Sequence, residues 1–266
     1  MTPELQAYLR TAIRAAREAA AIQLAERGSD LGVGTKSSDI DIVTRVDTLC
    51  EERIRRVIAE EHPDHVVIGE ELGHEASGRM RWIVDPLDGT VNYAHGFPFY
   101  CVSIALEADG EVVVGVVYDP ERDELFTATK GGGAWLNGRP LQVTATAELR
   151  QALLATGFAY VEDRIELNLG VFARVLPRVR SVRRPGSAAL DICYVASGRL
   201  DGFWELGLNP WDVAAGLLVV REAGGTVTGE DGGPYRLGDR VLVATNGHLH
   251  GKLLDLLQLP SVLARI

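Results

Sequence analysis

The chain has 266 residues, 46% of them hydrophobic, and can therefore bury a substantial core as one large domain or two small ones. Its formal net charge of −10 argues against a broad electrostatic grip on nucleic acid or anionic lipid, although local basic patches remain possible. An anionic substrate would need compensating cations, and divalent metal ions would supply them.

Cysteine usage and hydropathy indicate the compartment. Cys50, Cys101 and Cys193 are far apart, odd in number and form no Cys-x-x-Cys pair, so neither a disulfide framework nor a zinc site is expected. Charged residues interrupt the N-terminal segment, and no stretch approaches the ~20 apolar residues of a membrane helix. These features predict a soluble, unexported protein of the reducing cytoplasm with no membrane partner.

The first predicted element is an amphipathic helix over residues 3–27, which has apolar residues at three- and four-residue steps and ends at Gly28. A glycine-rich segment at 32–38 follows. It lacks the Gly-x-x-x-x-Gly-Lys-Ser/Thr spacing and the preceding strand of a nucleotide triphosphate-binding loop, so we reject that interpretation. Lys36 in this segment is either a mobile cation near a metal site or a solvated lysine.

Two acidic positions lie at the ends of the next predicted elements. A short strand over 39–44 precedes a helix over about 46–61, which places Asp47 in a first turn where an acid is usually a cap. A β-branched strand at 66–68 ends in Gly69-Glu70-Glu71, and two adjacent glutamates there suggest that one points into a crevice. Residues 73–78 are expected to form a surface loop.

Residues 81–92 read Arg-Trp-Ile-Val-Asp-Pro-Leu-Asp-Gly-Thr-Val-Asn and are the strongest candidate for chemistry. A strand is expected to deliver Asp85, Pro86 to end its ladder, and Asp88 to add a second carboxylate beside Gly89. The residues after Gly89 can open a helix, whose N–H groups would face whatever the acids hold. The pattern suits a phosphate bridged to the acids by divalent metal, but it is also an ordinary turn signal.

The remaining pattern predicts a layered α/β fold. Strands at 100–106, 111–118 and 125–129 form an antiparallel meander, and the glycine-rich segment 131–139 is interpreted as turns. The second half alternates strands near 152–156, 180–183, 201–205 and 241–245 with helices near 165–176, 187–197, 211–223 and 249–257. The change of pattern near residue 145 predicts a single domain over 1–266, with halves at about 1–145 and 146–266 that share one core.

The segment around Asp212 resembles the first motif, because it also places an acid at the entry to a predicted helix. Pro210 and Trp211 fix the entry to a helix whose small residues permit close packing, and an unpartnered acid would be costly there. A metal ion would be a partner, although an acid in a first helical turn is commonly a cap. His248 and His250 form another candidate ligand pair, but alternate histidines at this place are more often on the surface.

These motifs together resemble the inositol monophosphatase family of magnesium-dependent, lithium-sensitive phosphomonoesterases. The resemblance covers nearly the whole chain and rests on Gly69-Glu70-Glu71, Asp85-Pro86-Leu87-Asp88-Gly89-Thr90-Val91-Asn92-Tyr93, Gly186-Ser187-Ala188-Ala189-Leu190, Glu205 and Trp211-Asp212-Val213-Ala214-Ala215-Gly216. It implies an αβαβα sandwich, usually a homodimer, that binds two or three Mg²⁺ ions per active site.

The resemblance also implies the metal ligands. Glu70, Asp85 and the Leu87 carbonyl match those of the first metal, and Asp85, Asp88 and Asp212 match those of the second. A third, weaker metal in the family also depends on Glu70, and Glu70 is predicted to be a catalytic residue as well as a ligand.

Catalytic and substrate roles carry over in the same way. Asp47 and Thr90 match the pair that orients and deprotonates the attacking water, the Gly89 and Thr90 amides would cradle the phosphate, and Lys36 matches the lysine of a mobile loop. Four further matches are with substrate-binding residues: Asp88, Ala188, Glu205 and Asp212.

The function expected from this resemblance is in-line hydrolysis of a small phosphate monoester by a metal-activated water. Val91-Asn92 replaces the Lys-Glu that nucleotide-type relatives more often show, which favours inositol 1-phosphate or a similar polyol phosphate. Fructose 1,6-bisphosphate, nucleotide 3′-phosphates and histidinol phosphate remain alternatives on the same scaffold. A different class also stays open, namely a non-catalytic regulatory partner of a transcription complex.

Overall fold

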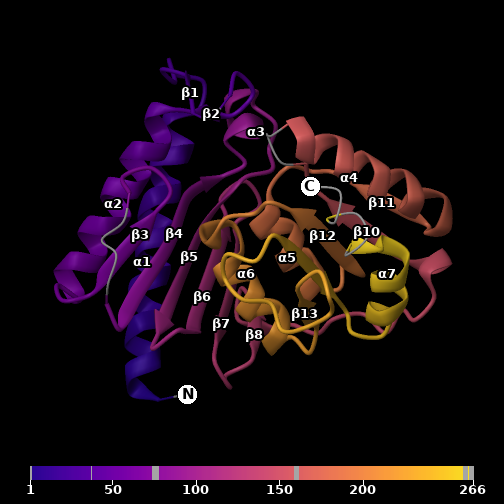
Figure 1. The fold of residues 1–266 in the computed structure, drawn as a ribbon. Helices are drawn as coiled ribbons and strands as arrows, with labels where there is room; N and C mark the ends of the chain where they lie inside the picture. Colours follow the sequence, from indigo (N-terminus) through magenta and orange to yellow (C-terminus); the bar gives the residue numbers. More distant parts are fainter. Residues whose placement is uncertain (1, 37, 74–77, 159–161, 260–262, 264–266) are drawn as a thin grey trace.

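Alternating layers of helices and sheets build the molecule (Figure 1). The computed structural model describes residues 2–36, 38–73, 78–158, 162–259 and 263, and of residues 162–164 only the backbone. The two long helices α1 (Pro3–Glu26) and α2 (Arg45–Glu61) cover one face of a seven-stranded sheet. Helices α5 (Ala188–Ala196) and α6 (Pro210–Glu222) lie between this sheet and a five-stranded one. The outer face of the second sheet packs on α4 (Glu162–Val175) and α7 (His250–Leu257), which confirms the layered α/β class.

The seven-stranded sheet has the order β3-β4-β5-β6-β7-β8-β9. Strand β3 runs parallel to β4, and the later neighbours are antiparallel, as the meander predicts. Its strands are β3 (Val66–Gly69), β4 (Met80–Asp88), β5 (Cys101–Ala108), β6 (Glu111–Asp119), β7 (Glu124–Thr129), β8 (Ala134–Leu136) and β9 (Arg139–Pro140). Strands β8 and β9 begin in the glycine-rich segment 131–139, for which the sequence predicts turns. That prediction was wrong, because β8 pairs with β7 and β9 pairs with β8, and both strands are too short to show a period.

Pro86 does not end its strand, contrary to the sequence-based expectation. Strand β4 pairs Asp85 with Ser103, shifts register, and resumes with Asp88 opposite Cys101. A proline lacks the N–H that a ladder needs, so the strand bulges locally, and the bulge absorbs the missing bond. Both acids therefore belong to one strand, which ends where Gly89 begins the short helix α3 (Thr90–Ala94).

The five-stranded sheet has the order β11-β10-β12-β14-β13 and is mixed. Strand β10 runs parallel to both neighbours, whereas β14 is antiparallel to β12 and β13. The strands are β10 (Leu153–Thr156), β11 (Ser181–Arg183), β12 (Gly202–Leu206), β13 (Thr226–Thr228) and β14 (Val241–Thr245). The sequence did not predict β13, a three-residue edge strand.

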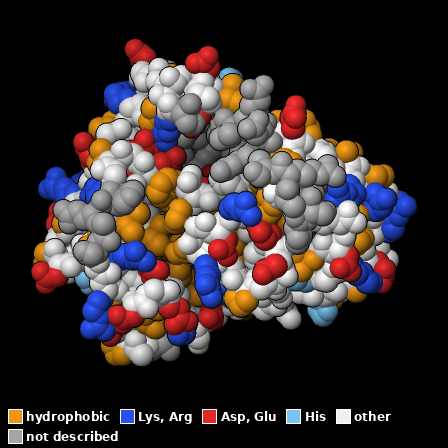
Figure 2. All heavy atoms as spheres, in the orientation of Figure 1, with side chains coloured by type: hydrophobic (Ala, Val, Ile, Leu, Met, Phe, Trp, Pro, Cys, Tyr) orange, Lys and Arg blue, Asp and Glu red, His pale blue; other side chains and the backbone are white. Residues whose placement is uncertain are grey.

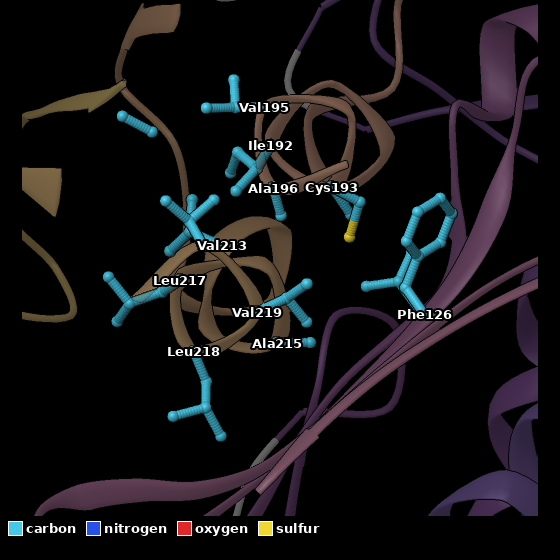
Figure 3. Close-up of a cluster of buried hydrophobic side chains, with 14 of the residues drawn as sticks. Phe126, Ile192, Cys193, Val195, Ala196, Val213, Ala215, Leu217, Leu218 and Val219 are labelled. Carbon is cyan, nitrogen blue, oxygen red and sulfur yellow. The ribbon is translucent and has the colours of Figure 1, made fainter. Parts of the chain in front are cut away.

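Small residues let the middle helices approach both each other and the first sheet (Figure 3). A Cβ at Gly216 of α6 would lie 2.8 Å from Ile192 Cγ2 of α5, and one at Gly115 of β6 would lie 2.7 Å from the Ala215 carbonyl oxygen. This core joins residues of both sequence halves, for example Phe126 and Val219. The single domain divided near residue 145 stays a prediction, with that position falling between β9 and β10.

Three further predictions concern a short strand, two loop segments and membrane helices. The strand expected over 39–44 shrinks to β2 (Ile42–Val43), which pairs with β1 (Gly34–Thr35). Residues 74–77 of the expected loop 73–78, and Ser37 of the glycine-rich segment, lie outside the described residues. Within the described chain, no helix is long and apolar enough to cross a membrane.

Candidate functional site

A cleft of about 430 Å³ opens where the N-termini of α3, α5 and α6 meet. Every site residue predicted from the sequence lines it, except Asp47, which contacts the cleft through Thr90. Acidic and basic side chains are interspersed over the face drawn in Figure 2. Inside the cleft the balance is different, because among the described lining residues Lys36 and Arg184 are the only bases, against seven acids: Asp41, Glu70, Asp85, Asp88, Asp191, Glu205 and Asp212.

The turn from β4 into α3 holds its own acids in place. The Leu87 N–H donates to Asp85 Oδ1 at 3.0 Å, which fixes the carboxylate of this buried residue. Gly89 has a φ of 96°, and a Cβ there would lie 3.0 Å from the Phe99 carbonyl oxygen, so both the conformation and the space require glycine.

Asp47 and Thr90 form a hydrogen-bonded pair across the cleft wall. Thr44 donates its N–H and its hydroxyl to Asp47 Oδ2 at 2.9 and 2.6 Å, so Asp47 is also the cap that the sequence predicts. The other oxygen, Oδ1, lies 2.8 Å from Thr90 Oγ1, which is also 3.0 Å from the Leu87 carbonyl. Burial raises the pKa of Asp47 although these hydrogen bonds lower it, which favours proton acceptance by this carboxylate.

Glu70 carries the one direct ion pair between predicted site residues in the described structure. Lys36 Nζ lies 2.7 Å from Glu70 Oε1 and also contacts Glu71 Oε1. Burial raises the pKa of Glu70 to about 7, against the lowering effect of the Lys36 ammonium. Lys36 is therefore not a merely solvated lysine, because it lines the cleft and its single ammonium group pairs with two glutamates.

Helix N-termini hold the other two acids. Ser187, the cap of α5, donates its hydroxyl to Asp88 Oδ2 at 2.6 Å, and the Ala189 N–H donates to the same oxygen at 2.7 Å. The Asn209 N–H donates to Asp212 Oδ2 at 2.6 Å at the start of α6, so Asp212 caps its helix and also lines the cleft. The positive ends of these two helix dipoles thus face the same space.

The charges of these acids demand a cation. Burial, followed by repulsion from Glu70, Asp88 and Asp212, raises the pKa of Asp85 well above its usual range, and burial with the same kind of repulsion raises that of Asp212. Carboxylate and carbonyl oxygens are the ligands that magnesium prefers. The donor chemistry therefore fits a divalent cation.

The described side chains do not stand as a ready-made metal cage of three or more acid, histidine or cysteine groups. The hydrogen bonds explain why these groups do not already converge on one point. Lys36 Nζ binds one oxygen of Glu70, and backbone N–H groups bind one oxygen each of Asp85 and Asp212. A carboxylate has two oxygens, so these bonds leave a second ligand atom on each aspartate. Glu70 keeps its second oxygen in the same way, and its Oε1 would become a metal ligand only if Lys36 moved away from it.

This cluster predicts how stability varies with pH. Burial raises the pKa of Glu70 to about 7 and that of Glu205 to about 8 in the folded chain, above the ordinary value of 4.5. The folded state then binds more protons than the unfolded state, so without divalent metal the free energy of unfolding should fall as pH rises from about 5 to about 8. Thermal unfolding in chelator across this range measures the slope.

Two controls define that experiment. Glu205→Gln removes one of the two groups and should make the decline shallower, and added Mg²⁺ should stabilise the wild type most at the upper end of the range. A melting temperature that is constant or rises over the same interval would contradict the charge arrangement described above.

Glu51 is a buried acid beside the site that the sequence analysis missed. It is fully buried, and its Oε2 accepts the Glu71 N–H at 2.7 Å, while Oε1 accepts the Leu72 N–H at 3.2 Å and Arg55 Nε at 2.8 Å. These bonds hold the turn that carries Glu70. The available signal was the position of Glu51 one helical turn after Asp47, which places both acids on one face of α2.

Glu51→Gln should destabilise the protein by about 1–3 kcal/mol, because the amide NH₂ cannot accept one of the three hydrogen bonds and leaves a buried donor unpaired. It should also raise the Mg²⁺ concentration needed for half-maximal activity, since Glu70 loses its support. Urea unfolding and a Mg²⁺ titration of activity measure the two effects. The exposed neighbour supplies a matched control, Glu52→Gln, and equal behaviour of the two variants would contradict the role of Glu51.

The two histidines near α7 have different environments. His248 is exposed, but the surface position expected for His250 was wrong, because its ring nitrogens lie 3.0 Å from Thr228 Oγ1 and 2.8 Å from Thr245 Oγ1 in the core. Both nitrogens are thus used structurally, which leaves His250 no role as a metal ligand. Cys50, Cys101 and Cys193 are buried free thiols, and burial raises the pKa of each.

Comparison with known proteins agrees with the fold and with the acid-lined cleft. A profile described as the inositol monophosphatase family matches residues 4–259. The chain is 44% identical over 255 residues to the inositol-1-monophosphatase of Synechocystis sp., covering 94% of this chain and 88% of that protein. It is 43% identical over 255 residues to the Nus factor SuhB of Pasteurella multocida, covering 94% and 95%. The crystal structure of the extragenic suppressor protein suhB from Bartonella henselae superposes with a TM-score of 0.90 at 39% identity, covering 95% of this chain and 98% of that one.

The layered fold and its acid-lined cleft, with these similarities, define a phosphoric monoester hydrolase. The chain belongs to the inositol monophosphatase family, which confirms the resemblance seen in its motifs.

Proposed function

We propose that the chain hydrolyses inositol 1-phosphate or a similar polyol monophosphate with the help of two or three Mg²⁺ ions. The observation that supports this most is the gathering of Glu70, Asp85, Asp88 and Asp212 on one cleft that holds only two basic residues among the described ones. Glu70, Asp85 and the Leu87 carbonyl would hold one ion, and Asp85, Asp88 and Asp212 a second. When bound, the ions would neutralise the phosphate and make a bound water more acidic.

Asp47 and Thr90 would take the proton of the attacking water. The Thr90 hydroxyl donates to Asp47 Oδ1, so the lone pairs of Oγ1 can accept a hydrogen bond from a water molecule in the cleft. As the water oxygen bonds to phosphorus and the bond from phosphorus to the alcohol oxygen breaks, the water proton would pass to Thr90 Oγ1 while the threonine proton moves to Asp47. The departing alkoxide would take its proton from a water molecule in the cleft. The raised pKa of Asp47 supports this direction of transfer.

The phosphate and the departing alcohol would use separate parts of the cleft. The Gly89 and Thr90 amides begin α3 and would donate to phosphate oxygens. Lys36, once displaced from Glu70, would remain near enough to offset the negative charge. Asp88, the Ala188 backbone and Glu205 would bind hydroxyl groups of the alcohol, with Asp212 beside them.

Val91 and Asn92 support a polyol over a nucleotide. Val91 lines the cleft, and Asn92 Nδ2 braces α3 by donating to the Phe99 and Pro185 carbonyls at 2.7 and 2.9 Å. Nucleotide-type relatives more often have a charged Lys-Glu pair at these two positions. Such a pair would lack the two hydrogen bonds that Asn92 makes, and its charged side chains would be solvated.

The test is phosphate release by the purified protein with Mg²⁺ across neutral to alkaline pH. A panel of inositol 1-phosphate, fructose 1,6-bisphosphate, a nucleotide 3′-phosphate and histidinol phosphate ranks the alternatives by kcat/KM. We expect inositol 1-phosphate to rank first, and no release from it would refute the proposed substrate. Lithium inhibition and a homodimer belong to the same proposal, and activity with added Li⁺ and sedimentation of the protein test them.

A second candidate function is a regulatory partnership with the transcription machinery. It is supported by the 43% identity to a relative that bears the name Nus factor. A cell that carries only a catalytically dead variant would then grow normally, and the protein would co-purify with RNA polymerase. A growth defect in that cell, with no co-purification, would leave hydrolysis as the function.

A further inference from the structure

The cleft contains a buried acid that the roles above do not use. Asp191 lies in the first turn of α5, is 1% exposed and lines the cleft. Its Oδ1 has no hydrogen-bond partner within the part of the chain that the structure describes. Such a group is expensive to bury, so native structures nearly always give it a partner, and a ligand is one source of such a partner.

A complementary donor lies on the neighbouring helix. Trp211, in the first turn of α6, also lines the cleft, and its Nε1–H is likewise buried without a partner among the described residues. An alcohol hydroxyl both donates and accepts a hydrogen bond, so an alcohol with several hydroxyls can satisfy an orphaned acceptor and an orphaned donor on one cleft. Within the described residues, no protein group forms a hydrogen bond with Asp191 Oδ1 or with the Trp211 Nε1–H.

The electrostatic surroundings of Asp191 agree with an uncharged hydroxyl as ligand. Burial, followed by repulsion from Glu205 and Asp88, raises the pKa of Asp191 well above its usual range, and Arg184 lowers it. Arg184 acts on Asp191 through its charge and not through a hydrogen bond. A second phosphate group at this position would add negative charge to an acidic wall and would be repelled.

We propose that Asp191 is a substrate-binding residue whose Oδ1 forms a hydrogen bond with a hydroxyl group of the departing alcohol. This inference rests on the proposed function and deepens it, because it selects a hydroxyl-bearing alcohol that has no second phosphate on the Asp191 side. Trp211 supplies the matching donor from α6.

The test compares two substrates that differ in hydroxyl content. Inositol 1-phosphate offers hydroxyls to Asp191, whereas 4-nitrophenyl phosphate has none. The ratio of kcat/KM for the two is independent of the fraction of enzyme that is folded. Asp191→Leu should lower this ratio by about 10- to 100-fold, the loss expected when a buried hydrogen bond to a substrate hydroxyl is removed.

Two other variants make the result interpretable. Asp191→Asn keeps the shape of the side chain and one acceptor, so it should fold and should lower the ratio less, by roughly threefold to tenfold. Asp201→Asn is the control, because Asp201 is buried outside the cleft, where it accepts from Thr144 Oγ1 at 2.6 Å and the Leu153 N–H at 2.8 Å. It should leave the ratio unchanged.

Each outcome decides the matter. A ratio that stays constant in both Asp191 variants, with the two activities falling together or not at all, overturns the role of Asp191 and leaves the proposed function standing. If Asp191→Leu does not fold, an unchanged ratio in Asp191→Asn has the same meaning. A wild type that hydrolyses 4-nitrophenyl phosphate but no polyol phosphate overturns the proposed function and this inference with it.

Discussion

Asp88→Asn should reduce kcat by at least about 10²- to 10³-fold with the fold intact, because it removes one of the charges that would hold the second metal ion. In the structure Asp88 Oδ2 accepts from Ser187 Oγ and from the Ala189 N–H. The amide oxygen of asparagine can accept the same two bonds, so α5 keeps its position. Circular dichroism and thermal unfolding check the fold, and phosphate release measures turnover.

The control for this variant is Asp201→Asn, which neutralises a buried acid away from the cleft. It should lose stability, because Asp201 accepts two hydrogen bonds, while kcat stays near the wild-type value. Near-normal turnover in Asp88→Asn would refute the assignment of the site. An equal loss of turnover in both variants would point instead to a general effect of buried charge.

Chelation of divalent metal should abolish hydrolysis entirely, and Mg²⁺ should restore it. The cleft wall has seven acids and two bases among its described residues, so an anionic phosphate would be repelled from it without added cations. Dialysis against a chelator followed by a Mg²⁺ titration of phosphate release measures this. The restored activity should rise cooperatively, since two ions share Asp85 in the proposed arrangement.

Calcium gives a second arm of that experiment. It also binds carboxylates, but it prefers more ligands at longer distances than magnesium, so it should occupy the cleft without restoring full turnover. Residual activity in chelator that equals the activity in Mg²⁺ would contradict the proposed mechanism, because the side chains alone offer too little positive charge for phosphate binding.

The part of the site that one short stretch encodes was predictable from the sequence. Asp85, Asp88 and Gly89 lie within five residues, so strand and turn preferences place them without any knowledge of the fold. Only the geometry of the link was mispredicted, because a bulge at Pro86 lets β4 continue to Asp88. Local chemistry was thus a good guide to which residues gather there, and a poorer guide to how.

The convergence of distant acids was not predictable from local pattern. The pairing of β3 with β4 brings Glu70 near Asp88, whereas Glu205 on β12 and Asp212 on α6 reach the same cleft only through packing between layers. The grouping of these acids in the sequence analysis came from the family resemblance. Glu51 and Asp191 were missed because each looks like an ordinary helical acid. Their distinguishing feature is burial, which depends on packing between layers. The local sequence offered only a weak hint of it at Glu51, through its spacing from Asp47, and none at Asp191.

The most direct test of the central claim is crystallographic. The wild type would be crystallised with Mn²⁺ and inorganic phosphate, and anomalous diffraction would locate the metal. We predict anomalous peaks beside the carboxylates of Asp85, Asp88 and Asp212, with Lys36 moved away from Glu70. Phosphate would lie between those peaks and the Gly89 and Thr90 amides. A cleft without anomalous peaks, at a Mn²⁺ concentration that supports full activity in solution, would contradict the metal-dependent mechanism.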